Sequence, residues 1–81
     1  MYRFPLPLFK VGDQVKSRTY PELGLLEVTY VEPYIEAFSI GTVPIVTVMI
    51  PYAGQEDDDA DDLRLINRPT NVVHQYYKEG A

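Results

Sequence analysis

The segment Val43-Pro44-Ile45-Val46-Thr47-Val48-Met49-Ile50 decides the fold class. It is dense in β-branched residues, which favour strands, and a proline directly after it ends the regular pairing. Because side chains alternate across a strand, one face carries Val46, Val48 and Ile50, and the other carries Ile45, Thr47 and Met49. Both faces are apolar. We therefore expect one face in the core and the other covered by the N-terminal residues or by a partner.

Shorter strand-like runs flank this segment on both sides. Before it, Leu25 to Val31 alternates apolar with polar residues, as a half-buried strand requires. Gln14 to Arg18 is a further strand, and a connection runs through Tyr34 to Ser39. After it, Leu63 to Ile66 is a short final strand. The pattern predicts a mostly β domain of four or five strands.

Length and cysteine content narrow the class of protein. The chain has 81 residues and no cysteine, so it holds one domain at most, without disulfides, thiolate zinc sites or thiol nucleophiles. No stretch approaches the roughly 18 apolar residues of a membrane span, and the N-terminus lacks the apolar core of a signal peptide. We expect a cytoplasmic protein that does not bind membranes.

The negative charge of the chain is local. The formal net charge is −5, but six of the 12 acidic residues lie within Glu56 to Asp62. The rest of the chain carries seven basic against six acidic residues. We interpret the run as an acidic loop between the last two strands. The net negative charge argues against a nucleic-acid-binding protein that works by neutralising many phosphates.

The order of these signals resembles that of SH3-like small β-barrels, the group that includes Tudor and KOW-type modules. The resemblance rests on Phe9-Lys10-Val11-Gly12-Asp13-Gln14-Val15, the break at Gly24, the segment Val43 to Ile50, and Asp62-Leu63-Arg64-Leu65-Ile66. It implies a five-stranded SH3-like barrel over residues 9–66, with a final short helical turn at the Asp-Leu step. Residues 1–8 then form an extended arm, and residues 67–81 a tail in which Val72 to Tyr77 has the spacing of one or two helical turns.

The acidic run admits four interpretations. Asp57, Asp59 and Asp61 have the spacing that begins an EF-hand calcium loop, but the sixth position is Asp62 instead of Gly and the twelfth is Arg68 instead of Glu. The run also suits a docking surface that steers a basic partner, a nucleic-acid mimic that inhibits a phosphate-binding protein, or a solvated loop that keeps the fold soluble. We expect no metal and no cofactor.

Aromatic and apolar side chains complete the predicted docking surface. Tyr20, Tyr34 and Tyr52 are expected in loops near the strand ends, and Ile45 and Met49 on the outer face of the strongest strand. The resemblance to Tudor-like domains also implies that these tyrosines and Phe38 could form an aromatic cage for a methylated cation. The predicted partner-binding residues are Tyr20, Tyr34, Ile45, Met49, Tyr52, Glu56, Asp57, Asp58, Asp59, Asp61 and Asp62.

Catalysis has little support in the sequence. His74 is the only histidine, and no cysteine or serine elbow accompanies it, so a nucleophile cannot be paired with a base. The carboxylates crowd a loop that we expect to be open, where nothing would drive their pKa values apart. The sequence therefore favours a non-catalytic accessory or regulatory subunit, and a phage-encoded regulator is one form that fits.

The predicted partner is a protein with a basic surface, and a second copy of the chain is an alternative occupant of the apolar strand. The alternative function is that of a KOW-like barrel that binds nucleic acid. It would require several basic residues to share one face: Arg3, Lys10, Lys16, Arg18, Arg64 and Arg68.

Overall fold

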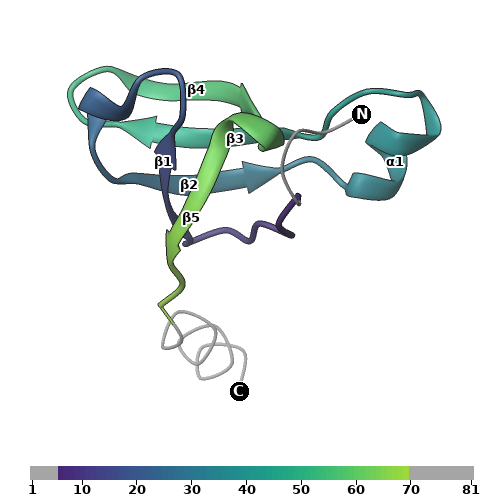
Figure 1. Cartoon of the computed structure of the whole chain (residues 1–81), viewed down its shortest axis with the longest axis horizontal. Coiled ribbons are helices and arrows are strands. Elements are labelled where there is room, and N and C mark those ends of the chain that lie inside the picture. Colours follow the sequence, from purple (N-terminus) through teal and green to yellow (C-terminus); the bar gives the residue numbers. More distant parts are fainter. Residues whose placement is uncertain (1–5, 70–81) are drawn as a thin grey trace.

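Five antiparallel strands form one sheet in the computed structural model, which describes residues 6–69 (Figure 1). The strands are β1 (Gln14–Ser17), β2 (Leu26–Val31), β3 (Ile45–Ile50), β4 (Gly54–Asp59) and β5 (Leu63–Asn67). Their order in the sheet is β4-β3-β2-β1-β5, so the chain meanders through four strands and β5 returns to the free edge of β1. The prediction of a mostly β domain is confirmed. Closure into an SH3-like barrel stays a prediction.

Three short helical segments connect the strands. A 3-10 turn, η1 (Pro21–Leu23), lies between β1 and β2, and a second, η2 (Ala60–Asp62), lies between β4 and β5. The latter turn matches the helical turn expected before the final strand. The connection between β2 and β3 contains α1 (Tyr34–Ser39), which starts after the fixed φ of Pro33 and buries Ala37. No helix within residues 6–69 is long and apolar enough to cross a membrane.

The core lies between two groups of strands that cross at a steep angle. In Figure 1, β1 and β5 run across the direction of β2, β3 and β4. The inner faces meet in one cluster of buried residues: Phe9, Val15, Leu26, Val28, Val46, Val48, Ala60 and Leu63. Burying each of the larger side chains stabilises the fold by roughly 1.5–3 kcal/mol. The predicted inner face of β3 is therefore confirmed at Val46 and Val48, which are 0% and 2% exposed.

The interpretation of the acidic run as a loop is wrong, because its residues form a strand and a 3-10 turn. Gly54–Asp59 is strand β4, paired residue by residue with β3 from Ile50↔Gly54 to Ile45↔Asp59. Asp is depleted in strands, but the neighbouring β3 supplies a full ladder of hydrogen bonds for this segment. Pairing with a strong strand therefore overrides the weak local propensity of the acidic residues.

Leu6 and Phe9 pack on the core, and within residues 6–69 the outer face of β3 stays open. Phe9 is 5% exposed and Leu6 packs against the core cluster. On the outer face Met49 remains 40% exposed and Ile45 is half-buried. Of the predicted N-terminal arm the structure describes residues 6–8, and the helical turns predicted around Val72 to Tyr77 lie outside the described residues.

Candidate functional site

A groove of about 850 Å³ lies between the segment after β1 and the β3–β4 hairpin. Its floor is apolar, made by Leu26, Val48 and Ile50. Tyr20 and Leu23 line it from the segment that contains η1. The lining also includes six acidic residues of β4 and η2: Glu56, Asp57, Asp58, Asp59, Asp61 and Asp62. A concave surface with an apolar floor and a negative wall suits a ligand that is both cationic and partly apolar.

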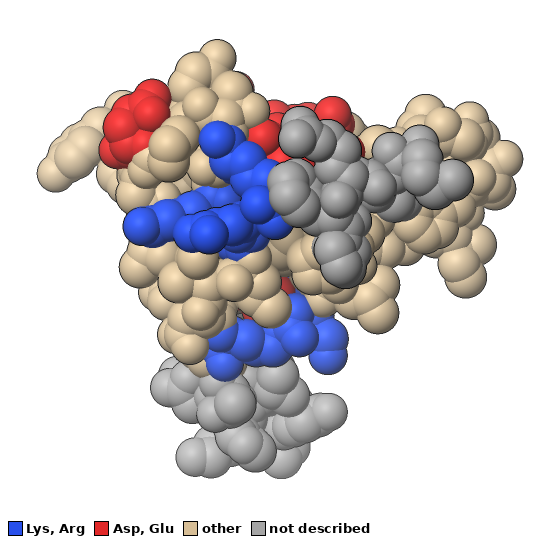
Figure 2. Space-filling model, in the orientation of Figure 1, with Lys and Arg blue, Asp and Glu red and all other residues tan. Residues whose placement is uncertain are grey.

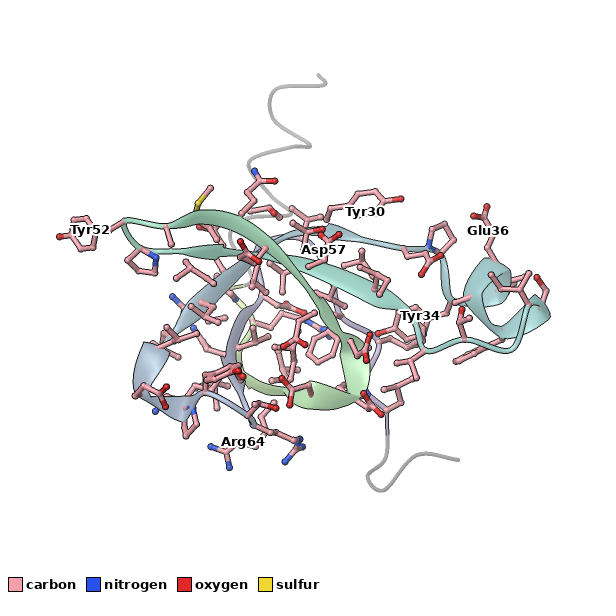
Figure 3. The ribbon with its side chains drawn as sticks, turned by 90° about the horizontal axis from the view of Figure 1, so that it is seen from above. Tyr30, Tyr34, Glu36, Tyr52, Asp57 and Arg64 are labelled. Atoms are coloured by element: carbon pink, nitrogen blue, oxygen red, sulfur yellow. The ribbon has the colours of Figure 1, made fainter. Side chains whose placement is uncertain are left out.

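The alternation along β4 divides its carboxylates between two faces. Glu56 and Asp58 stand opposite Val48 and Val46, so they share the face of the core side chains. Asp57 and Asp59 stand on the other face of the strand. Asp57 is fixed there because the hydroxyl of Thr47 donates a hydrogen bond of 2.7 Å to Asp57 Oδ1. Figure 3 shows Asp57 on the opposite side of the molecule from Arg64.

Asp62 anchors the segment that follows β1, which forms one wall of the groove. Its carboxylate accepts hydrogen bonds from Ser17 Oγ at 3.1 Å, from the Thr19 amide at 3.1 Å and from Thr19 Oγ1 at 2.6 Å. The Arg18 amide donates to the Asp62 carbonyl at 2.7 Å, and the Tyr20 amide donates to Ser17 Oγ at 2.9 Å. These bonds hold the segment carrying Tyr20 against η2, so this wall of the groove is formed before any ligand binds.

Asp58 and Asp62 form a carboxyl pair in this groove. Burial, together with the hydrogen bond to Asp62, raises the pKa of Asp58 to about 7. For Asp62, burial acts to raise the pKa, but hydrogen bonds from Asp58, Thr19 and Ser17 outweigh it and hold the pKa below its ordinary value. The expectation that the carboxylates are too open for their pKa values to diverge is therefore wrong, because two of them share a partly enclosed site.

The predicted partner-binding residues do not form one surface. Tyr20 and the acidic residues line the groove, whereas Ile45 and Met49 belong to the outer face of β3. Tyr52 projects from the β3–β4 turn and is fully exposed, far from Tyr34 in Figure 3. Of the predicted set, the structure thus brings Tyr20 to the acidic lining of the groove, while the side chains of Asp57 and Asp59 share the outer face with Ile45 and Met49.

Tyr34 is half-buried and holds two parts of the chain together. Its hydroxyl donates a hydrogen bond of 2.7 Å to the Pro7 carbonyl and accepts one of 3.2 Å from the Phe9 amide. The ring packs edge-to-face on Phe38, with 5.8 Å between centroids, and contacts the core cluster. Tyr34 therefore fastens the residues before β1 to α1. Because Tyr52 and Tyr20 lie elsewhere, these aromatics do not gather into one cage.

Sequence reasoning missed the groove floor and the Ser17 and Thr19 contacts. Leu26 and Val48 read as core residues in the sequence, and nothing in the sequence marks them as the floor of a groove. The hydroxyls of Ser17 and Thr19 lie 45 and 43 positions before Asp62, so no local motif links them. A further missed feature is the apolar surface at α1, where Ile35 is 83% and Ile40 is 70% exposed.

Of the basic residues within 6–69, Arg18 lines the groove and the others lie outside its lining. Lys16 and Arg64 are register partners on β1 and β5, next to buried Ser17 and Leu63, so both point to the outer face. Figure 2 shows Lys and Arg side chains over these two strands and a second basic group lower in the view. Arg68 is engaged with Asp13, and Arg3 lies outside the described residues.

The acidic residues do not converge as metal ligands do. Within residues 6–69, no group of three or more His, Asp or Glu side chains is arranged to hold a metal ion. The strand geometry explains why the EF-hand-like aspartates do not converge on one ion. Alternate residues of β4 share one face, but they are spaced about 7 Å apart along the strand. The arrangement thus suits an extended cationic ligand better than a point charge.

Comparisons with known proteins found no match to this chain. No family model matches it, and neither a curated protein nor a solved structure does.

Proposed function

We propose that this protein is a non-catalytic interaction module, an accessory or regulatory subunit that binds a protein partner with a basic surface. The observation that carries the proposal is the groove, which combines an apolar floor with an acidic wall that includes the carboxylates of Glu56, Asp58 and Asp62. The absence of cysteine supports the further proposal that it works in the cytoplasm.

Two physical effects would operate in such a complex. The carboxylates attract a basic partner over a distance of about one Debye length and raise the association rate. Once docked, the partner covers the apolar floor and the ring of Tyr20, which slows dissociation. The hydrogen bonds around Asp62 reduce the ordering that binding would otherwise require, because the segment with Tyr20 is already fixed.

A matched pair of charge variants tests the role of the groove. Glu56→Gln and Asp57→Asn each remove one charge from adjacent positions on opposite faces of β4. With a ten-residue Lys/Arg-rich peptide as probe, both variants should slow association by a similar factor, measured by stopped-flow fluorescence. E56Q should also speed dissociation more than D57N does, because a basic side chain held at Glu56 also covers the apolar floor, whereas the Asp57 side chain is held on the outer face of β4. Equal dissociation rates in the two variants, or no binding of the peptide at low salt, would contradict the proposal.

Nucleic-acid binding is the second candidate, favoured by the pairing of Lys16 with Arg64 across β1 and β5. Affinity for single-stranded RNA or duplex DNA should then fall steeply with salt. Removing either charge, in K16Q or R64Q, should lower the slope of log affinity against log salt by about 1. Absence of binding at low salt would remove this candidate.

A further inference from the structure

Strand β4 is an edge strand with an open side. It stands at the end of the sheet order, and within residues 6–69 its hydrogen-bonded neighbour is β3. The opposite edge of β4 therefore presents the backbone N–H and C=O groups of alternate residues of this six-residue strand. Such an edge is a template for another strand, and natural proteins either protect it or use it for binding.

The charge of β4 selects what can pair with this edge. Four consecutive residues, Glu56 to Asp59, are acidic, so a second copy of β4 would place like charges opposite one another. A basic strand would instead place opposite charges across the new pairing, which stabilises a sheet. The edge is thus protected against self-association and complementary to a cationic segment.

Both faces of β4 are acidic, which constrains the sequence of the occupant. A strand added to the edge would direct alternate side chains toward Glu56 and Asp58 on the groove face, and toward Asp57 and Asp59 on the outer face. Each residue of the added strand that lies beside Glu56 to Asp59 would therefore meet a carboxylate. On the groove face, the long aliphatic stems of Lys or Arg would also cover Ile50 and approach the ring of Tyr20.

From this arrangement we infer that the protein captures an extended Lys/Arg-rich segment of its partner by adding it as a strand to the open edge of β4, beside the groove. The inference rests on the proposed function and specifies its mode. The occupant is a run of about six residues with basic side chains on both faces, matching the six residues of β4. Backbone pairing supplies the orientation, and the carboxylates supply the choice of sequence.

N-methylated peptides separate backbone pairing from charge attraction. Three peptides of identical sequence and charge are compared: an unmodified Lys/Arg-rich octamer, one methylated on the amides of its odd residues, and one on those of its even residues. In a strand only one of these two sets faces β4. Methylation of the amides that face β4 should lower the affinity of the peptide about tenfold or more. Methylation of the other amides should change it less than threefold, as measured by fluorescence anisotropy.

The outcomes distinguish the mode of binding from the function. If the two methylated peptides bind as tightly as each other while E56Q still weakens binding, strand addition is overturned and the proposed function stands. If the unmodified octamer does not bind at all, both are overturned. A second readout supports the mode directly: alternate amides of β4 should gain protection from hydrogen exchange when the unmodified octamer is bound.

Discussion

Arg68 and Asp13 form a two-point ion pair that ties the residue after β5 to the turn before β1. Arg68 Nε donates to Asp13 Oδ1 and Arg68 Nη2 donates to Asp13 Oδ2, both at 2.8 Å. Asp13 is 2% exposed, and the Lys10 amide donates to the same carboxylate at 2.8 Å. Burial acts to raise the pKa of Asp13, but these hydrogen bonds and the charge of Arg68 outweigh it and hold the pKa below its ordinary value. The pair is therefore charged at neutral pH and closes the β1–β5 edge.

Removing the Asp13 carboxylate should destabilise the fold strongly. Asp13→Ala loses the ion pair and the bond from Lys10, so we expect the free energy of unfolding to fall by about 2–4 kcal/mol. Urea denaturation of the single variants and of D13A/R68A measures the coupling between the two residues. The double variant should lose less than the sum of the single losses. Additive losses would show that the pair does not act as a unit.

The Asp58–Asp62 pair should make stability fall as pH rises toward neutrality. The pKa of Asp58 is about 7 in the folded chain and 3.8 in the unfolded chain, so between these values the folded state binds more protons. The contribution of Asp58 to stability is therefore present below about pH 4 and is lost as pH rises through about 7. Because Asp58 is partly solvated, we expect a loss of only about 1–2 kcal/mol.

The variant Asp58→Asn should remove this loss. Its unfolding free energy should exceed that of the wild type at pH 8 and show a flatter profile from pH 4 to 8. Asp57→Asn is the matched control, because it removes one charge from the outer face of β4 and leaves the pair intact. A wild-type profile that rises over this range, or equal profiles for the two variants, would contradict the assignment.

The hydroxyl of Tyr34 should account for the attachment of the residues before β1. Tyr34→Phe keeps the ring on Phe38 but leaves the Phe9 amide and the Pro7 carbonyl without this partner. We expect a loss of about 1–2 kcal/mol and faster hydrogen exchange at the Phe9 amide. Tyr30→Phe is the control, since Tyr30 is 55% exposed, and it should change stability by less than about 0.5 kcal/mol. Equal effects of both changes would remove the structural role of the Tyr34 hydroxyl.

The strands with an apolar pattern are predictable from the sequence, and the acidic strand is not. Alternation marks Leu26 to Val31, and β-branched density marks Ile45 to Ile50, because in both cases the side chains that form the core also define the strand. In β4 the residues carry no such signal. That strand forms because β3 pairs with it, and pairing across a hairpin is a property of two segments together.

The candidate site also has a part that the sequence predicts and a part that it does not. The acidic run is visible in the sequence as a charge cluster, so its carboxylates could be named. Its apolar floor and the Ser17–Asp62 contact depend on segments brought together by the crossing of β1 and β5 over the other strands. The inward direction of Tyr34 likewise depends on α1, which places the hydroxyl between Pro7 and Phe9.

Tyr52 occupies a position that favours glycine, so replacing it should stabilise the fold. It follows Pro51 in the β3–β4 turn with φ of +67°, and the Ala53 amide donates to the Ile50 carbonyl at 3.0 Å, as in a type II turn. The side chain is fully exposed, so few contacts are lost. Tyr52→Gly relieves the left-handed backbone but gives a more flexible unfolded chain, and we expect a net gain of about 0.5–1 kcal/mol.

Ala53→Gly supplies the control for this change, because Ala53 lacks a positive φ and should lose about as much stability as Tyr52→Gly gains. Thermal and urea denaturation measure both variants. If Y52G lowers affinity for the Lys/Arg-rich peptide while it raises stability, the strained tyrosine is retained for contact with the partner, which is the trade-off seen at binding sites. A loss of stability in Y52G would instead mean that the ring makes contacts that stabilise the turn.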